Sequence, residues 1–233
     1  MKEYRDDLRA ALRATRAIDG ARLRAEYAAP DQSFADVENV LLYNVGNASF
    51  RHLATAGLEV LRTTSPDARH HLTYSLTKEE PQPLSTGPVV GRVELDELPA
   101  AADKVSAWWA ALRPRLSPGP TTLSGEFAIE VEIRRSRGFV SLVKPMLDGL
   151  ISALQSHDGS GEDHVRAALR RHGDDESLWA LLNEPPPVLG PRRRLVRAHR
   201  AGIAWNPADD LCARFRILPV EAGPALRAVV RSV

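Results

Sequence analysis

Residues 127–133 read Phe-Ala-Ile-Glu-Val-Glu-Ile, and the larger apolar side chains alternate with alanine or glutamate. A period of two is that of a β-strand with one buried face. A short distance downstream, residues 142–154 carry apolar side chains at helical spacing, and Pro145 fits a first helical turn because its missing N–H is not needed there. These two segments predict a strand followed by a helix.

The rest of the chain mixes strands and helices without a regular βαβ alternation. We expect an opening helix over residues 5–27 with an interruption near Gly20. Further helices are predicted over residues 101–112, 162–171 and 175–183, and strands over residues 36–45, 71–77, 89–95, 192–204 and 211–220. The strands at 71–77 and 89–95 are expected to form an antiparallel meander. This pattern favours an α+β fold with a mostly antiparallel mixed sheet and helices packed on one face.

One domain is expected over residues 1–233, with a possible minor boundary near residues 185–191, where three prolines follow one another. The segment beyond that boundary is too short to form a reliable core of its own. The 43% hydrophobic and 26% charged residues are typical of a globular protein. The net charge of +1 provides no strong overall field, so a nucleic-acid interface would depend on local patches.

Several observations predict a cytoplasmic protein that does not enter a membrane. The single cysteine, Cys212, excludes an intrachain disulfide and favours a reducing compartment. The charged N-terminal segment lacks the apolar core of a secretory signal, and no apolar run reaches the roughly 20 residues that span a bilayer.

The common catalytic motifs are absent from the sequence: there is no P-loop, G-x-G-x-x-G, H-E-x-x-H, G-x-S-x-G or C-x-x-C. The most informative stretch is instead the start of the helix predicted over residues 142–154. Lys144 and Asp148 are four residues apart and therefore share a helix face. The carboxylate could hold a divalent cation while the lysine contacts a phosphate, or the two could form an ordinary surface ion pair.

Residues 144–149, Lys-Pro-Met-Leu-Asp-Gly, resemble the helix start of the RusA-like Holliday junction resolvases, which reads Lys-Pro-Asp-x-Asp-Asn. Lys144, Pro145 and Asp148 match, whereas methionine stands where the family has its first metal-binding aspartate and glycine replaces the asparagine. The family has a further acid well downstream, and Asp158 is closer than that acid should be. The resemblance covers about a dozen residues and implies magnesium-dependent phosphodiester cleavage with Asp148 as a ligand.

Other acids could complete such a site. Asp36 and Glu38 lie on one face of the strand predicted over residues 36–45 and could join Asp148 in an acidic pocket, or they could be the solvated face of that strand. Asp158 belongs to a group of acids and histidines around a Gly-Ser-Gly loop, where it could ligate a metal or cap the next helix. Asp209 follows an Asn-Pro turn signal and is either a turn residue or a further ligand.

One dense basic stretch contains Arg192, Arg194 and Arg197. On a strand, arginines at alternate positions would form a stripe able to follow a phosphate backbone, which suggests nucleic acid or a nucleotide as a partner. A charged edge strand that resists aggregation is the structural alternative.

The leading hypothesis is a metal-dependent enzyme that acts on phosphodiesters or nucleotides, for example a nuclease. Its catalytic residues would be Asp148 and Lys144, its Mg²⁺ or Mn²⁺ ligands Asp36, Glu38, Asp148 and Asp158, and its substrate-binding residues Arg192, Arg194 and Arg197. The hypothesis requires that the acids converge in the fold. The alternative is a non-enzymatic binding or scaffold protein, such as a homo-oligomer, in which the acids are caps and turns and Trp108 or Trp109 fills an interface.

Overall fold

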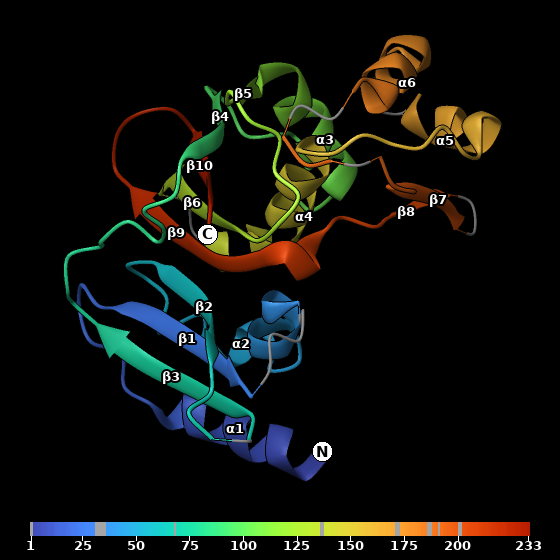
Figure 1. Cartoon of the computed structure of the whole chain (residues 1–233). Helices are drawn as coiled ribbons and strands as arrows, with labels where there is room; N and C mark the ends of the chain where they lie inside the picture. Colours follow the sequence, from blue (N-terminus) through green and yellow to red (C-terminus); the bar gives the residue numbers. More distant parts are fainter. Residues whose placement is uncertain are drawn as a thin grey trace.

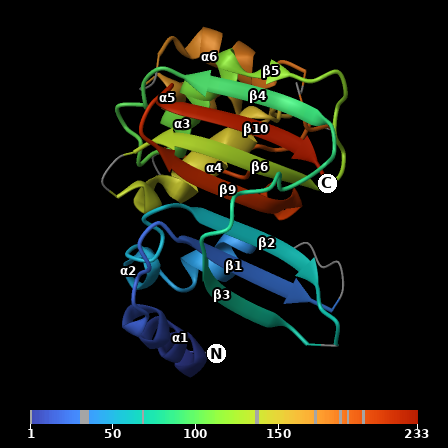
Figure 2. The ribbon, with the colours of Figure 1, turned by 90° about the vertical axis from the view of Figure 1, so that its left-hand side faces the viewer.

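The computed structural model describes residues 2–30, 36–67, 69–135, 138–170, 173–185, 188–190, 192–199 and 202–233. Strands from both halves of the chain form one eight-stranded sheet, and the helices α2 to α6 lie on one side of it (Figure 1). Figure 2 shows the other face of the sheet, with these helices behind it. An α+β fold with a mostly antiparallel mixed sheet and helices packed on one face is thereby confirmed.

The elements are α1 (Lys2–Ala14), β1 (Arg22–Ala29), the π-helical turn η1 (Asn39–Tyr43), α2 (Asn47–Phe50), β2 (Leu58–Thr64), β3 (His71–Thr77), β4 (Val89–Leu95), α3 (Val105–Leu112), the 3-10 turn η2 (Arg113–Arg115), β5 (Ser117–Pro118), β6 (Phe127–Arg134), the 3-10 turn η3 (Phe139–Leu142), α4 (Val143–Ala153), α5 (Glu162–Leu169), α6 (Asp175–Asn183), β7 (Val196–His199), β8 (Gly202–Trp205), the 3-10 turn η4 (Asp209–Leu211), β9 (Cys212–Val220) and β10 (Leu226–Ser232). Strands β7 and β8 form a separate hairpin.

The pairing pattern of the large sheet is symmetric about its β2–β9 pair. The strand order is β3-β1-β2-β9-β6-β10-β4-β5. Strand β1 is parallel to β2 and antiparallel to β3, and in the same way β6 is parallel to β9 and antiparallel to β10. Because parallel neighbours need a crossover, each half carries one: η1 and α2 lie between β1 and β2, and η3 and α4 lie between β6 and β9.

The two crossovers meet on the helical side of the sheet. The Asn47 side chain of α2 donates a hydrogen bond of 3.3 Å to the carbonyl oxygen of Val140 in η3. The later part of the first crossover thus lies beside the start of the second. Side chains almost a hundred residues apart are therefore neighbours at this place.

Helix α4 is held in place by the core on that side. Trp108 and Trp109 of α3 are fully buried and contribute to the main hydrophobic cluster, with each indole burying about 150–250 Å². Gly149 lets α3 and α4 approach closely, because a Cβ at this position would overlap Trp108 and lie 3.1 Å from the Val105 carbonyl oxygen. Since both tryptophans belong to the core, neither fills an interface, which corrects that part of the scaffold interpretation.

The opposite face of the sheet carries arginine and glutamate side chains in ion pairs. The Arg216 guanidinium lies 2.7 Å from Glu130 and 3.4 Å from Glu59, and Arg227 contacts Glu132 at 3.3 Å. Glu130 and Glu132 therefore point away from α4, even though their strand directly precedes it. Within the described residues, no helix is both long enough and apolar enough to cross a lipid bilayer.

Several predicted elements are confirmed. Strands β3, β4 and β6 and helices α3 to α6 occur where the sequence pattern places them. The predicted meander is wrong, because β3 and β4 lie in different halves of the sheet and do not pair. The connecting segment instead runs across the uncovered face, where the carbonyl oxygen of Leu84 accepts a hydrogen bond from Arg214.

The N-terminal predictions need correction. Residues 22–29 form strand β1 and not the end of a helix, because pairing with both β2 and β3 satisfies the backbone and buries every second side chain. Residues 36–45 do not form a strand: after Asp36 the chain makes helical turns that bury Leu41 and Leu42. The strand at 58–64 was not predicted, because its side chains are buried on both faces and do not alternate in polarity.

The C-terminal predictions are partly confirmed. Strand β9 occurs as expected, whereas residues 192–204 do not form one strand. Strand β7 begins only at Val196 and pairs with β8 in a hairpin. Of the suggested boundary at 185–191, residues 186, 187 and 191 lie outside the described residues.

Candidate functional site

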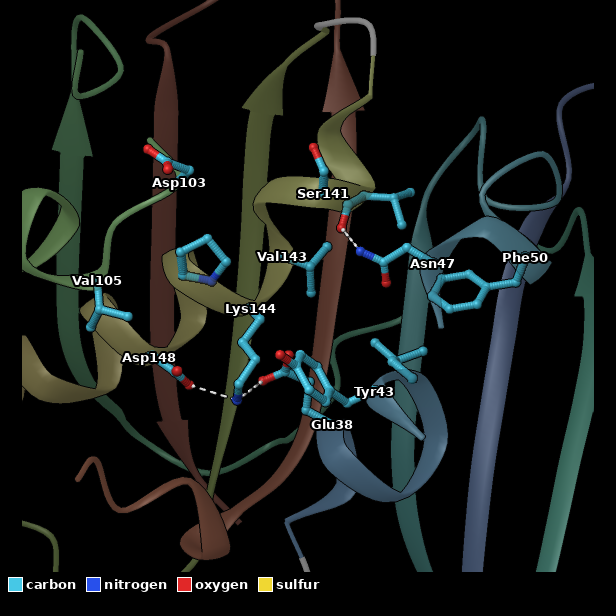
Figure 3. Close-up of a pocket in the computed structure, with 13 residues that line it drawn as sticks. Glu38, Tyr43, Asn47, Phe50, Asp103, Val105, Ser141, Val143, Lys144 and Asp148 are labelled. Carbon is cyan, nitrogen blue, oxygen red and sulfur yellow. Dashed lines mark hydrogen bonds and ion pairs between the residues drawn. The ribbon is translucent and has the colours of Figure 1, made fainter. Parts of the chain in front are cut away.

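Four carboxylates from three separate segments gather around Lys144. Its ammonium group lies 3.4 Å from Asp148 Oδ1, one turn further along α4, and 3.6 Å from Glu38 Oε2 of the first crossover (Figure 3). Because both acids contact the same nitrogen, these two oxygens lie within about 7 Å of each other. The Glu38 side chain is only 7% exposed and that of Asp148 12%, so this is no ordinary surface ion pair.

Asp36 and Asp209 complete this group. Asp36 accepts a hydrogen bond of 3.0 Å from the backbone N–H of Asn39 and so caps the helical turn that contains Glu38. Asp209, in the turn that leads into β9, interacts electrostatically with Asp36. Asp36, Glu38 and Asp209 also border a cavity of about 10 Å³, which is near the lower limit for one water molecule. We refer to Asp36, Glu38, Asp148 and Asp209 as the acid cluster.

Burial disfavours the ionised form of the carboxyl groups in the acid cluster. Burial raises the pKa of Glu38 to about 8; Lys144 acts in the opposite direction, and Asp148 adds to the increase. Burial also raises the pKa of Asp209 to about 7, with Asp36 as the next cause. The pKa of Asp148 is raised by burial too, although the Lys144 charge opposes this. The folded protein therefore keeps protons on this cluster at pH values where an exposed carboxyl group would release them.

Lys144 responds in the complementary way. Burial alone would lower the pKa of its ammonium group, but the surrounding carboxylates, led by Glu38 and Asp148, outweigh burial and raise this pKa. The lysine is therefore positively charged throughout the physiological pH range. Its nitrogen also lies 5.3 Å from the ring centre of Tyr43, whose side chain is largely exposed, as expected for a cation–π contact.

A cavity of about 330 Å³ opens beside Lys144, and we call it the acidic cavity. Three carboxylates line it, those of Glu38, Asp103 and Asp148. Figure 3 shows Lys144 between Glu38 and Asp148 at one end of this cavity, and Asn47 and Ser141 at the other end. Its remaining lining is mostly apolar. The Lys144 ammonium is therefore accessible from the acidic cavity.

The structure thus brings together Asp36, Glu38, Lys144 and Asp148, as the leading hypothesis requires. The reason differs from the predicted one, because Asp36 and Glu38 belong to a capped helical turn and not to a strand face. Asp209 was considered only as a turn residue or an extra ligand. Its position directly before β9, the parallel neighbour of β6, places it beside Leu147 and Ile151 in the later part of α4.

Asp158 lies outside the acid cluster. Its carboxylate accepts hydrogen bonds from the Ser160 backbone N–H at 2.9 Å and from the Ser160 hydroxyl at 2.7 Å, and these bonds lower its pKa. The Nδ1 atom of His157 lies 3.5 Å from Asp158 Oδ1. Asp158 therefore stabilises the turn before α5, but it does not cap this helix, whose N-cap residue Gly161 has no side-chain hydrogen bond.

The basic stretch is not the stripe that was predicted. Arg192 and Arg194 precede β7, so only Arg197 lies on a strand. All three are exposed, and none of them lines the acidic cavity. Arg193 of the same stretch lies 3.9 Å from Asp210, which follows Asp209 in the chain.

The carboxylate oxygens of the acid cluster are suitable ligands for a hard divalent cation, but they do not form a complete coordination site. Within the described residues, no three His, Cys, Asp or Glu side chains are placed to hold one metal ion together. The Lys144 ammonium lies between Glu38 and Asp148. Mg²⁺, however, is usually bound by one or two carboxylates, with water and substrate phosphate as the other ligands. Two acids of this cluster would satisfy that requirement.

Comparison of the chain with protein-family models, with curated proteins and with solved structures found no match. The resemblance of residues 144–149 to the RusA-like resolvases therefore stays a prediction.

Proposed function

We propose that this protein is a Mg²⁺- or Mn²⁺-dependent enzyme that hydrolyses phosphodiester or nucleotide phosphate bonds at the acid cluster. The observation that carries the proposal is the convergence of four carboxylates on one lysine, from segments that begin at residues 36, 144 and 209. Buried carboxylates are costly unless they are paired, and one ammonium group cannot pair with four. Such an arrangement is expected where a further cation takes part.

The raised pKa values of Glu38 and Asp209 support the same conclusion. The pKa values of these groups are raised first by burial and second by the negative charges of neighbouring carboxylates. A divalent cation would take over the role of the protons that these groups hold, and its binding would release them to solvent. We assign the metal to Glu38 and Asp148, which line the acidic cavity, and not to Asp158. When bound, the metal would polarise a phosphate oxygen of the substrate.

Lys144 has the position and the charge to bind a substrate phosphate. Its ammonium group reaches the acidic cavity and lies between the two proposed metal ligands. A lysine that loses part of its contact with the acids when a metal enters can turn toward the phosphate.

The experiment is a calorimetric titration of MgCl₂ and MnCl₂ into the protein at pH 8, together with a cleavage assay on single-stranded, duplex and branched DNA, on RNA and on nucleotides. We expect saturable metal binding and metal-dependent cleavage in the wild type, and loss of both in Asp148→Asn. Asp158→Asn is the matched control and should retain both. If the wild type binds neither metal at millimolar concentration and cleaves none of these substrates, the proposal is wrong.

A further inference from the structure

A second cavity, of about 640 Å³, adjoins the acidic cavity. The two share three lining residues, Asn47, Val140 and Ser141, which are contributed by both crossovers. The hydrogen bond between Asn47 and Val140 therefore lies where the two cavities meet. Since the acidic cavity ends at Asn47 and Ser141 on the side away from Asp148 (Figure 3), the second cavity extends it away from the acid cluster.

The character of the second cavity is opposite to that of the first. Its described lining contains no carboxylate, whereas Arg51, His52 and Arg135 all contribute to it. We call it the basic cavity. Apolar groups, among them Phe139 and Pro219, make up much of its remaining surface. A ligand that fits it therefore carries negative charge together with apolar surface.

The arginines of the basic cavity are available to a ligand. Arg51, directly after α2, is exposed and has no ion pair with any described residue. Arg135, directly after β6, lies 2.9 Å from Glu221, and both side chains of this pair are more than half exposed. Exposed ion pairs contribute at most about 1 kcal/mol, so a phosphate can readily replace Glu221 as the partner of Arg135.

We propose that the basic cavity binds the backbone of a nucleic-acid strand whose neighbouring phosphodiester lies at the acid cluster. This inference rests on the proposed function and makes its substrate a polynucleotide, not a mononucleotide. The acid cluster by itself repels a polyanion, and Arg51 and Arg135 supply the attraction that such a strand requires. A cavity of about 300–1,000 Å³ holds one ligand of moderate size, so two adjoining cavities have room for more than one nucleotide.

Tyr43 indicates that the strand is unpaired where it enters the acidic cavity. Its side chain lines this cavity and is 63% exposed, so its ring is accessible to a base. Bases of single strands stack on exposed aromatic rings, and the sugar and base of the next nucleotide can contact the apolar wall near Phe139. The bases of a regular duplex are already stacked and would not reach this ring.

The test is the fluorescence anisotropy of a labelled 12-nucleotide strand, as DNA and as RNA, with the full chain in EDTA so that metal-dependent cleavage does not occur. We expect the double variant Arg51→Gln/Arg135→Gln to bind at least tenfold more weakly than wild type at 50 mM salt. The slope of log affinity against log salt should fall by about 1.4, because two phosphate contacts are lost and each contributes about 0.7 on a single strand. Arg227→Gln, on the opposite face of the sheet, is the matched control and should change affinity less than twofold.

The outcomes separate this inference from the proposed function. Equal affinities of wild type and the double variant would overturn the strand-binding role, even if metal binding and hydrolysis of nucleotides were observed. Arginine-dependent binding without any metal binding or cleavage would support the basic cavity as a strand-binding site and refute the proposed enzyme. Preference for DNA or for RNA identifies the natural strand. If the double variant is unfolded by circular dichroism, the single variant Arg51→Gln decides, with an expected slope change of about 0.7.

Discussion

Replacement of Glu38 by glutamine should make the protein more stable at alkaline pH. The unfolded chain releases the Glu38 proton near its ordinary pKa of 4.5, whereas the folded protein holds it until about pH 8. A raised carboxyl pKa contributes stability that is fully present below pH 4.5 and is lost as the pH rises to 8. With 1.36 kcal/mol per pKa unit, the wild type loses about 3–5 kcal/mol over this interval through Glu38 alone. Glutamine has no proton to release and avoids this loss.

The assay is urea denaturation of wild type and Glu38→Gln in EDTA at intervals between pH 4.5 and 9. The difference between their free energies of unfolding should shift in favour of the variant by about 1 kcal/mol per pH unit, and then level off above pH 8. Glu94→Gln, at an exposed ion pair with Arg227, is the control and should differ from wild type by less than about 1 kcal/mol. A difference between Glu38→Gln and wild type that does not vary with pH would refute the reasoning.

Three further predictions concern the surroundings of the acid cluster and the core. Lys144→Met should destabilise the protein by about 1–3 kcal/mol at pH 7, because it leaves carboxylates without their ammonium partner. In urea denaturation this loss of stability should become smaller below pH 4.5. An equal loss at both pH values would contradict the prediction. Gly149→Ala should lower stability by about 1–3 kcal/mol in thermal or urea unfolding, since the added methyl group overlaps Trp108, whereas Gly125→Ala, with open space around its Cβ, should have a smaller effect. Cys212 is buried, and burial raises the pKa of its thiol. A maleimide should therefore label Cys212 in urea but not in the native protein at pH 8. Rapid labelling of the native protein would show that β9 opens at its start.

Part of the acid cluster could be predicted from the sequence because it is local. Lys144 and Asp148 lie one helical turn apart, so their contact follows from the helix alone. Their closeness to Glu38 does not follow from any local rule, because it requires that two crossovers lie on the same side of one sheet. The strand predicted for residues 36–45 was wrong for a related reason: a short apolar run is compatible with a strand or a helical turn, and only its partners decide between them.

The position of Asp209 in the acid cluster could not be predicted from the sequence either. The sequence marks a turn before a strand, and this turn exists as η4. An aspartate in such a turn is usually solvated, and nothing near it in the sequence indicates that its carboxyl group meets Asp36 in a poorly hydrated place. Because β9 is the parallel neighbour of β6, the turn before β9 lies at the same edge of the sheet as the start of β6 and next to α4.

The sequence by itself determined the fold class, the strands and helices with a clear hydrophobic period, and the Lys144–Asp148 pair, because these depend on interactions between near neighbours in the chain. Only the tertiary structure decided the strand order, the symmetric arrangement about the β2–β9 pair, and the meeting of the acid cluster with the basic cavity. The physical reason is that an alternating strand can pair with many partners of similar local energy, and the burial of the whole core selects among them.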